Sequence, residues 1–346
     1  MSIFQKSFIP KNSEHKKYGM KSSVLFLVLS LLLIFSFFFS LCFGSVFMNV
    51  GETLVSLFSG NFDDPFVRIL LYLRLPRVCG SVFSGAALAV SGVLIQAVLH
   101  NPMAAPNIIG VNSGAGLGAV LMLTVFPSAV SFLPSAAFCG ALCACFLIYG
   151  VSMKTGASPS TLILVGIAVS SLLNAAINTV KILFPDSVYD ADVFMIGGLS
   201  GLTFSRILIP CIVILLGVVA ATVFSRKADI LSLGDDAAQT LGLNVKVTQF
   251  FFLILASVLA GCAVSFAGLL GFVGLVVPHI ARRFVGENHG ILIPISALGG
   301  SLLVSVCDLL GRTLFAPYEI PVGILLSFVG VPFFLFLILS GRKRYD

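Results

Sequence analysis

The chain is dominated by apolar runs of about 20 residues, which is the length at which a helix can cross the hydrocarbon core of a lipid bilayer. Ten such runs can be marked, and together they occupy most of the 346 residues. Their approximate bounds are 23–45, 78–99, 107–126, 132–152, 160–183, 206–225, 247–267, 269–284, 291–312 and 321–340. We therefore expect an all-α polytopic membrane protein with about ten transmembrane helices.

The composition supports a membrane protein over a soluble one. Hydrophobic residues make up 58% of the chain and charged residues 10%, whereas a soluble globular protein carries about 25% charged residues. A mean hydropathy of +1.11 leaves too few polar side chains to cover a soluble surface. The net charge of +6 does not indicate nucleic-acid binding, because the bases are scattered between apolar runs and form no cluster.

The distribution of basic residues predicts the orientation. If the N-terminus is cytoplasmic and the ten spans alternate, 14 of the 20 Lys and Arg residues fall on the cytoplasmic side, as the positive-inside rule requires. Both termini are then cytoplasmic. The first run exceeds 20 residues and no clear cleavage site follows it, which argues against a signal peptide.

The same reasoning divides the chain into few parts. Residues 1–22 form a cytoplasmic tail, residues 23–341 a single transmembrane domain, and residues 342–346 a second cytoplasmic tail. Residues 226–246 form the largest internal cytoplasmic segment.

Several kinds of chemistry have no sequence signature here. The chain contains no G-x-x-x-x-G-K-[ST], no H-E-x-x-H and no G-x-S-x-G. The eight cysteines lie in or beside apolar runs and form no C-x-x-C pair, so we expect them to pack as small hydrophobic residues. We therefore expect no catalytic residues, no metal site, no bound cofactor and no enzymatic activity in this chain.

Charges within a membrane span are costly and commonly functional. Asp308 is the one acidic residue clearly inside a predicted span, and Arg312 follows four residues later on the same helical face. Both lie toward the outer end of the span at 291–312, whereas ion-coupled transporters place carboxylates near the midplane. A structural ion pair at the interface and an ion-coupled secondary transporter remain as alternatives.

Small residues recur at the spacing that lets helix backbones approach closely in lipid. Gly110, Gly114 and Gly118 repeat every four residues, as do Gly85 and Ala89. Prolines lie at span ends or within spans. Glycine-rich, broken helices in a protein with many spans are typical of a transporter.

Four motifs carry a family resemblance. In chain order they are Leu73-Arg-Leu-Pro-Arg77 followed by Gly85-Ala-Ala-Leu-Ala-Val-Ser-Gly92 and Gln96; Asn101-Pro-Met-Ala-Ala-Pro-Asn-Ile-Ile-Gly110-Val-Asn-Ser-Gly-Ala-Gly116; Leu233-Gly-Asp-Asp-Ala-Ala-Gln-Thr-Leu-Gly242; and Gly271-Phe-Val-Gly-Leu-Val-Val-Pro-His-Ile-Ala-Arg282 followed by Asp308-Leu-Leu-Gly-Arg312 and Glu319-Ile-Pro-Val-Gly323. From about residue 50 onward, the chain resembles the FecCD-type permeases of type II ATP-binding-cassette (ABC) importers, which import ferric siderophores, haem and cobalamin.

The resemblance implies a fold, partners and a location. It implies ten helices per subunit and two permease subunits, identical or different, around a central pathway in a bacterial cytoplasmic membrane. Two ATPase subunits then bind ATP and magnesium, and an extracytoplasmic substrate-binding protein delivers the cargo. Family pathways bind cargo weakly, so no tight cargo site is expected in this chain, and a ferric siderophore is the commonest cargo.

The resemblance also implies roles for three arginines. Arg74 and Arg77 precede the span at 78–99, and Arg312 lies near the outer end of the span at 291–312. Matching arginines in the family receive glutamates from the binding protein, a role that suits the planar guanidinium. Arginines that reach to lipid headgroups are the alternative. Replacing Arg74 and Arg77 by Glu is expected to weaken docking and to leave the fold intact.

The third motif lies in residues 226–246, which the resemblance identifies as the segment that contacts the ATPase; we call it the coupling segment. Gly234 is expected to break the chain, Asp235 and Asp236 to begin a helix, and Gly242 to end it. An ordinary connecting loop is the alternative. The residues expected to contribute are Leu233, Gly234, Asp235, Asp236, Ala237, Leu241 and Gly242.

Two further groups match family motifs. Thr155, Ser158, Ser160 and Thr161 correspond to the inner gate region, although Pro159 differs from some relatives. Asn101, Pro102, Pro278 and His279 belong to family motifs without an assigned role.

Overall fold

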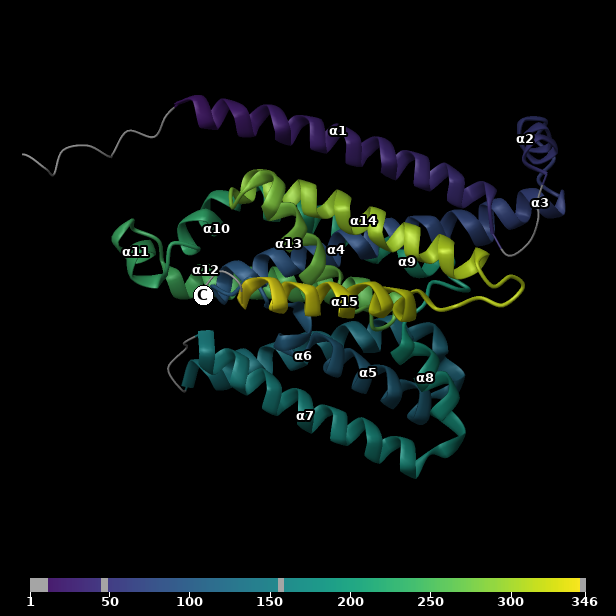
Figure 1. Ribbon diagram of the computed structural model, residues 1–346. Helices are drawn as coiled ribbons and strands as arrows, with labels where there is room; N and C mark the ends of the chain where they lie inside the picture. The colour runs from purple at the N-terminus through teal and green to yellow at the C-terminus, as the bar shows by residue number, and fades with distance from the viewer. Residues whose placement is uncertain (1–11, 45–48, 155–158, 343–346) are drawn as a thin grey trace, which may run out of the picture.

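The computed structural model describes residues 12–44, 49–154 and 159–342, and the regular structure within them is entirely helical (Figure 1). The long helices are α1 (Asn12–Cys42), α4 (Leu75–Val98), α5 (Val111–Val125), α6 (Leu133–Lys154), α7 (Pro159–Leu183), α9 (Phe204–Val223), α12 (Val245–Ala267), α13 (Val273–Val285), α14 (His289–Thr313) and α15 (Val322–Arg342). The short ones are α2 (Val50–Phe58), α3 (Pro65–Arg68), α8 (Val188–Ile196), α10 (Ser225–Leu231) and α11 (Asp235–Thr240).

Each of the ten predicted spans coincides with one long helix, so the predicted positions of the helices are confirmed. Within the described residues, seven helices are long and apolar enough to cross a membrane. α5 and α15 are shorter apolar helices, and the 13 residues of α13 extend only about 20 Å at 1.5 Å per residue. Ten full crossings therefore stay a prediction.

The second span begins earlier than predicted. The span was predicted at 78–99, but helix α3 begins at Pro65 and continues through a π-helical turn, Ile69–Arg74, into α4. Asp64 caps this run by accepting a hydrogen bond of 2.8 Å from the backbone N–H of Phe66, and that bond lowers the pKa of Asp64. Arg74 and Arg77 are therefore helical residues within one long run.

The two ends of the helix bundle carry different short elements (Figure 1). Helices α10 and α11 lie at one end, on the left of the view, together with the beginning of α1 and the end of α15. Helices α2 and α3 lie at the opposite end. We call these the α10 end and the α3 end.

The core of the bundle is α4, which packs against α14, α12, α13 and α9. The long helical run Pro65–Val98 contains α4, and 78% of its most apolar 18-residue stretch is buried inside the protein. The corresponding share is 11% in α1 and 17% in α7. The backbones of α4 and its neighbours touch at glycines. A Cβ atom at Gly85 would lie under 3.0 Å from the carbonyl oxygen of Gly300 in α14, and one at Gly92 would lie equally close to Gly274 in α13.

The glycines at positions 110, 114 and 118 form a second series, and it brings the backbones of α5 and α6 into contact. A Cβ atom at Gly114 or Gly118 would lie under 3.0 Å from backbone atoms of Gly140 or Ala136. The close helix packing predicted for these glycines is confirmed.

These contacts predict that Gly92→Ala strongly destabilises the protein. The added methyl group meets the backbone of α13, which cannot rotate away as a side chain can, so we expect a loss near the upper end of the range of about 1–3 kcal/mol for overpacking. Gly150→Ala in α6 is the matched control, because nothing lies within 4 Å of that position. Thermal unfolding of the two purified variants in one detergent measures the difference, and equal melting temperatures would contradict the packing argument.

Candidate functional site

At the α3 end, three arginines and two carboxylates converge from α4, α14 and the segment before α15. We call this set the arginine cluster; its members are Arg74, Arg77, Asp308, Arg312 and Glu319. The three positive and two negative charges leave one net positive charge. Four members, all except Asp308, line a cavity of about 170 Å³.

Arg77 joins the cluster's two carboxylates. Its Nε lies 3.0 and 3.1 Å from the carboxylate oxygens of Asp308, and its Nη1 lies 2.7 Å from Oε2 of Glu319. Asp308 is buried, whereas the side chain of Glu319 is 29% exposed. Arg77 therefore links α4 to α14 through a buried ion pair and to the start of α15 through a more exposed one.

Arg74 and Arg312 bind the end of α1. The Nη1 atom of Arg74 lies 2.7 Å from the carbonyl oxygen of Leu41 and 2.6 Å from that of Cys42. Arg312 donates to the carbonyl oxygen of Ser40 over 2.7 Å and also to its hydroxyl group. Free carbonyls at a helix C-terminus carry partial negative charge and favour cations. Arg312 also lies 3.5 Å from Asp308, its predicted i,i+4 partner.

The burial of these arginines bears on the predicted charge reversals. Arg74 and Arg312 are 5% and 2% exposed, and the side chain of Arg77 is 13% exposed. A glutamate at position 74 would face backbone carbonyls, and one at position 77 would face two carboxylates. We therefore expect these substitutions to destabilise the fold as well as to affect docking. A docking role for the cluster stays a prediction.

The coupling segment forms two short helices at the α10 end (Figure 1). As predicted, α11 begins at Asp235, between Gly234 with φ of +101° and Gly242 with φ of +82°. Leu233 and Leu241 are 63% and 61% exposed. Asp236, Ala237 and Gly242 are exposed as well, whereas Asp235 is half-buried. Two exposed leucines on a polar end of the molecule are typical of a surface that binds another protein.

Two histidines that the sequence analysis passed over hold this segment in place. His289, the first residue of α14, contacts Asp229 in α10. His100, which follows α4, contacts Leu231 at the end of α10. The position of both histidines beside helix ends could have indicated a structural role. Their partners could not be predicted, because these lie 60 and 131 residues away in the sequence.

The motif residues without an assigned role support local structure. Asn101 closes the turn after α4, because its Oδ1 accepts from the backbone N–H of Met103 over 2.9 Å; Pro102 lies in this turn. Pro278 is buried inside α13, and the ring of His279 packs edge-on against Phe333.

Gln96, quoted above as part of the first motif, joins three segments. Its Nε2 donates to the carbonyl oxygens of Ala104 and Gly274 over 3.0 and 3.2 Å. Arg282 donates to its Oε1. This buried amide therefore ties α4 to the following turn and to α13.

The predicted inner gate region is only partly described. Thr155 and Ser158 lie outside the described residues. Ser160 and Thr161 lie in the first turn of α7, the former exposed and the latter half-buried. Their role stays a prediction.

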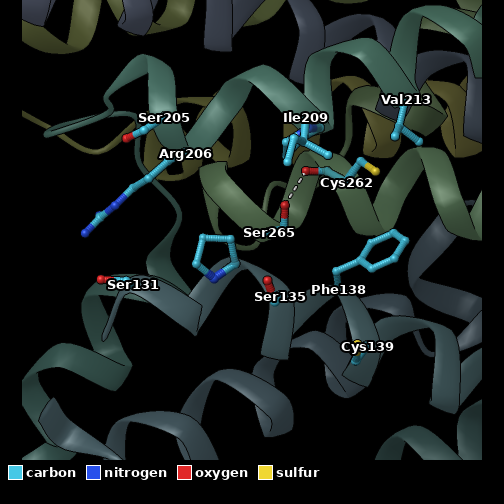
Figure 2. A pocket seen from close by; sticks show the side chains of 12 residues that line it. Ser131, Ser135, Phe138, Cys139, Ser205, Arg206, Ile209, Val213, Cys262 and Ser265 are labelled. Atoms are coloured by element: carbon cyan, nitrogen blue, oxygen red, sulfur yellow. Dashed lines mark hydrogen bonds between the residues drawn. The ribbon is translucent and has the colours of Figure 1, made fainter. Parts of the chain in front are cut away.

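A further cavity, with a volume of about 430 Å³, lies at the α3 end between α6, α9 and α12 (Figure 2). It shares no residue with the arginine cluster. Within the described residues, no group of three side chains could hold a metal ion.

Comparison with known proteins gives one consistent result. The model of the FecCD transport family matches residues 32–340. The Fe(3+)-citrate import system permease protein YfmE of Bacillus subtilis is 36% identical over 92% of this chain and 96% of its own length. The hemin transport system permease protein HmuU of Yersinia pestis is 36% identical over 86% of this chain and 91% of its own.

A solved structure agrees. A metal-chelate type ABC transporter in an inward-facing conformation superposes with a TM-score of 0.82 at 27% identity, covering 92% of this chain and 99% of its own.

The geometry of the arginine cluster predicts an order of stabilities. Asp308→Asn leaves Arg77 and Arg312 without their shared buried counter-charge and should cost about 3 kcal/mol. Glu319→Gln should cost less than about 1 kcal/mol, because that carboxylate is partly solvated. Asp63→Asn is the control, since Asp63 is 91% exposed in its pair with Arg68, and should cost least. Melting temperatures of the three variants test this order; a mild Asp308→Asn effect would show that the charges are not held as described.

Proposed function

The chain belongs to the FecCD transport family and is a permease subunit of an ABC importer, and we propose that its cargo is an iron–siderophore complex delivered by a substrate-binding protein. The observation that carries this proposal is the family match over residues 32–340. The named cargoes of the two relatives, Fe(3+)-citrate and hemin, are both iron chelates. Haem and cobalamin are the other cargoes to test.

The chain is a multi-pass protein of the cytoplasmic membrane, and its partners are those of an ABC importer. We place the α10 end and both termini in the cytoplasm, in agreement with the distribution of basic residues. The complex we propose contains two permease subunits, identical or different, and two ATPase subunits. This chain is then a non-catalytic pore subunit, while ATP and magnesium bind to the ATPases.

We assign docking of the binding protein to the arginine cluster. Its net charge of +1 and the partial exposure of Glu319 favour an incoming carboxylate. Arg77 is the member of the cluster that already donates a hydrogen bond of 2.7 Å to a partly solvated carboxylate, that of Glu319. A glutamate of the binding protein would compete with Glu319 for Arg77, while Arg74 and Arg312 stay bound to α1.

We assign contact with the ATPase to the coupling segment. The exposed Leu233 and Leu241 provide apolar contact area, and Asp236 beside them provides a charge that fixes the register of a complementary surface. The short α11 helix between two glycines holds these side chains on one protruding unit.

The ion-coupled alternative is disfavoured by the state of Asp308. A coupling carboxylate must gain and lose an ion near the midplane. Asp308 instead lies near the α3 end of α14, between Arg77 at 3.0 Å and Arg312 at 3.5 Å, which hold it as a structural anion.

Reconstitution separates the two functions. We expect proteoliposomes that contain this chain, its partner ATPase and the loaded binding protein to take up a labelled iron–siderophore only with ATP on the ATPase side. A protonophore should leave that uptake unchanged. Uptake that needs no ATP and collapses with the protonophore would establish the secondary transporter instead, and uptake of haem or cobalamin alone would change the cargo.

The competition at Arg77 gives a second prediction. Glu319→Gln should tighten binding of the substrate-binding protein several-fold, up to about fivefold, because the bond that it removes from Arg77 is worth up to about 1 kcal/mol. Asp63→Asn, which removes an exposed carboxylate at the same end, should change the affinity little. Dissociation constants measured on nanodiscs test both variants, and weaker docking of the Gln variant would remove the cluster from the docking site.

A further inference from the structure

Two neighbouring helices each contribute one histidine that binds the coupling segment. His100 lies two residues after the end of α4, and His289 begins α14. A third bond comes from α12, where Gln249 donates to Oδ1 of Asp235 over 3.0 Å. Both histidines lie at the α10 end, whereas the opposite ends of α4 and α14 carry the arginine cluster.

His289 binds α10 through Asp229. Its Nδ1 lies 2.7 Å from Oδ1 of Asp229, and its backbone N–H donates to the same oxygen over 2.8 Å. Asp229 thereby supplies an acceptor at the N-terminus of α14, where unpaired N–H groups and the helix dipole favour an anion. His289 is 2% exposed, and within the described residues its Nε2 has no hydrogen-bond partner. Its polar contacts are therefore committed to α10.

His100 binds the junction between α10 and α11. Its Nε2 lies 2.7 Å from the carbonyl oxygen of Leu231, the last residue of α10. The same atom lies 3.9 Å from Oδ1 of Asp235, the first residue of α11. A backbone φ of +48°, a conformation in which His is enriched, turns the chain at this position. One side chain therefore contacts both helices of the coupling segment.

The helices that carry these histidines are bound to each other along their length. Their backbones touch at Gly85 and Gly300. Ser81 and Ser305 share a hydrogen bond of 2.9 Å, and Ser301 donates to the carbonyl oxygen of Val82 over 2.7 Å. The ion pair between Arg77 and Asp308 closes the far end. The 24 residues of α4 carry this connection over about 36 Å.

We propose that His100 and His289 are positioning residues through which the α4–α14 pair moves the coupling segment when the binding protein docks at the opposite end. The inference rests on the proposed function. Because their backbones are in contact, α4 and α14 connect the arginine cluster to the α10 end. The two histidines attach this helix pair to the coupling segment, which meets the ATPase. Breaking either attachment separates docking from ATP hydrolysis.

Isosteric pairs of variants test the proposal in the assembled importer. His289→Asn keeps a nitrogen near the position of Nδ1, whereas His289→Leu removes it. His100→Gln keeps a nitrogen near the position of Nε2, whereas His100→Met removes it, and both carry the same backbone strain. ATP hydrolysis is measured in nanodiscs with and without the loaded binding protein. The readout is the ratio of the two rates within each variant.

The stimulation ratio is the rate of ATP hydrolysis with the loaded binding protein divided by the rate without it. We expect this ratio to fall at least about fivefold in the Leu and Met variants, which is the lower bound of typical allosteric coupling. The Asn and Gln variants should keep most of it. A purely structural role would lower the yield of complex and both rates in proportion, and an unchanged ratio would overturn the proposal. Failure of the proposed function itself is distinguishable, because the unmodified chain would then show no stimulation.

A second inference rests on a different observation. This is the cavity of about 430 Å³ between the beginnings of α6 and α9 and the end of α12 (Figure 2). Figure 2 shows Ser131, Ser205 and Arg206 at one side of the cavity and Ser135 and Ser265 in its middle. Phe138 and Val213 lie at the other side.

Position along the helices explains the polarity of this cavity. Arg206 lies in the first turn of α9, at the α3 end, and Val213 lies about two turns further into the bundle. Among the described residues that line the cavity, none is acidic and Arg206 is the one charged residue. A cation at membrane-interface depth above an apolar slot matches an amphiphile with a negatively charged headgroup.

We infer that this cavity binds one anionic phospholipid of the outer leaflet, with its phosphate at Arg206 and an acyl chain against Phe138 and Val213. Native mass spectrometry of protein released from nanodiscs that contain phosphatidylglycerol and phosphatidylcholine tests the inference. We expect the chain to retain phosphatidylglycerol preferentially, Arg206→Gln to reduce that retention about tenfold, and Val213→Phe to reduce it by filling the slot.

Arg68→Gln is the control, since Arg68 lies at the same end but is 61% exposed and paired with Asp63; it should retain the lipid as the unmodified chain does. Equal retention of the two lipids, or retention that survives Arg206→Gln, would overturn the site. Displacement of the lipid by millimolar inorganic phosphate would identify a site for free phosphate instead.

Discussion

Backbone contact between α4 and its neighbours is the constraint on which the rest of the bundle depends. In lipid, helix association has no hydrophobic driving force and relies on close packing and interhelical hydrogen bonds. Gly85 and Gly92 provide the first, because α14 and α13 occupy the space that a Cβ atom would need. Ser91 and Gln96 provide the second, through the carbonyl oxygens of Ala256 and Gly274. Both α14, which carries Asp308 and His289, and α10, which carries Asp229, pack against α4.

The arginine cluster is a consequence of that packing at one end. Once α4 and α14 are in contact, Arg77 meets Asp308, and each remaining guanidinium must find negative charge because an unpaired buried charge is costly. The end of α1 supplies it as backbone carbonyls. α1 buries few side chains of its own, so the bonds from Arg74 and Arg312 anchor a helix that apolar packing alone holds weakly. The same residues therefore fix α1 and line the small cavity of the arginine cluster.

The positions of the long helices could be predicted because hydropathy alone determines them. Close packing at the glycines could be predicted, because small residues spaced four apart lie on one face of a helix. The partner helix could not be predicted, since nothing in the sequence indicates that Gly92 meets Gly274. The burial of Arg74 and Arg312 was missed for the same reason. Their acceptors are backbone carbonyls of α1, which every residue possesses and no motif marks. The extension of the second span to Pro65 was missed because charged residues interrupt the apolar pattern that defines a span.

Differences in packing density determine where movement can occur. α4 and α14 are joined by backbone contact, two serine hydrogen bonds and an ion pair, and a close-packed interface of this kind does not deform continuously. α7 buries only 17% of its most apolar window, against 78% in the run that contains α4. Local opening occurs where buried contacts are few. A transporter needs both properties, one unit that carries displacement across the membrane without absorbing it and others that yield to it. Because His100 and His289 lie at the end of the stiff unit, the proposed attachment passes the displacement of that unit to the coupling segment.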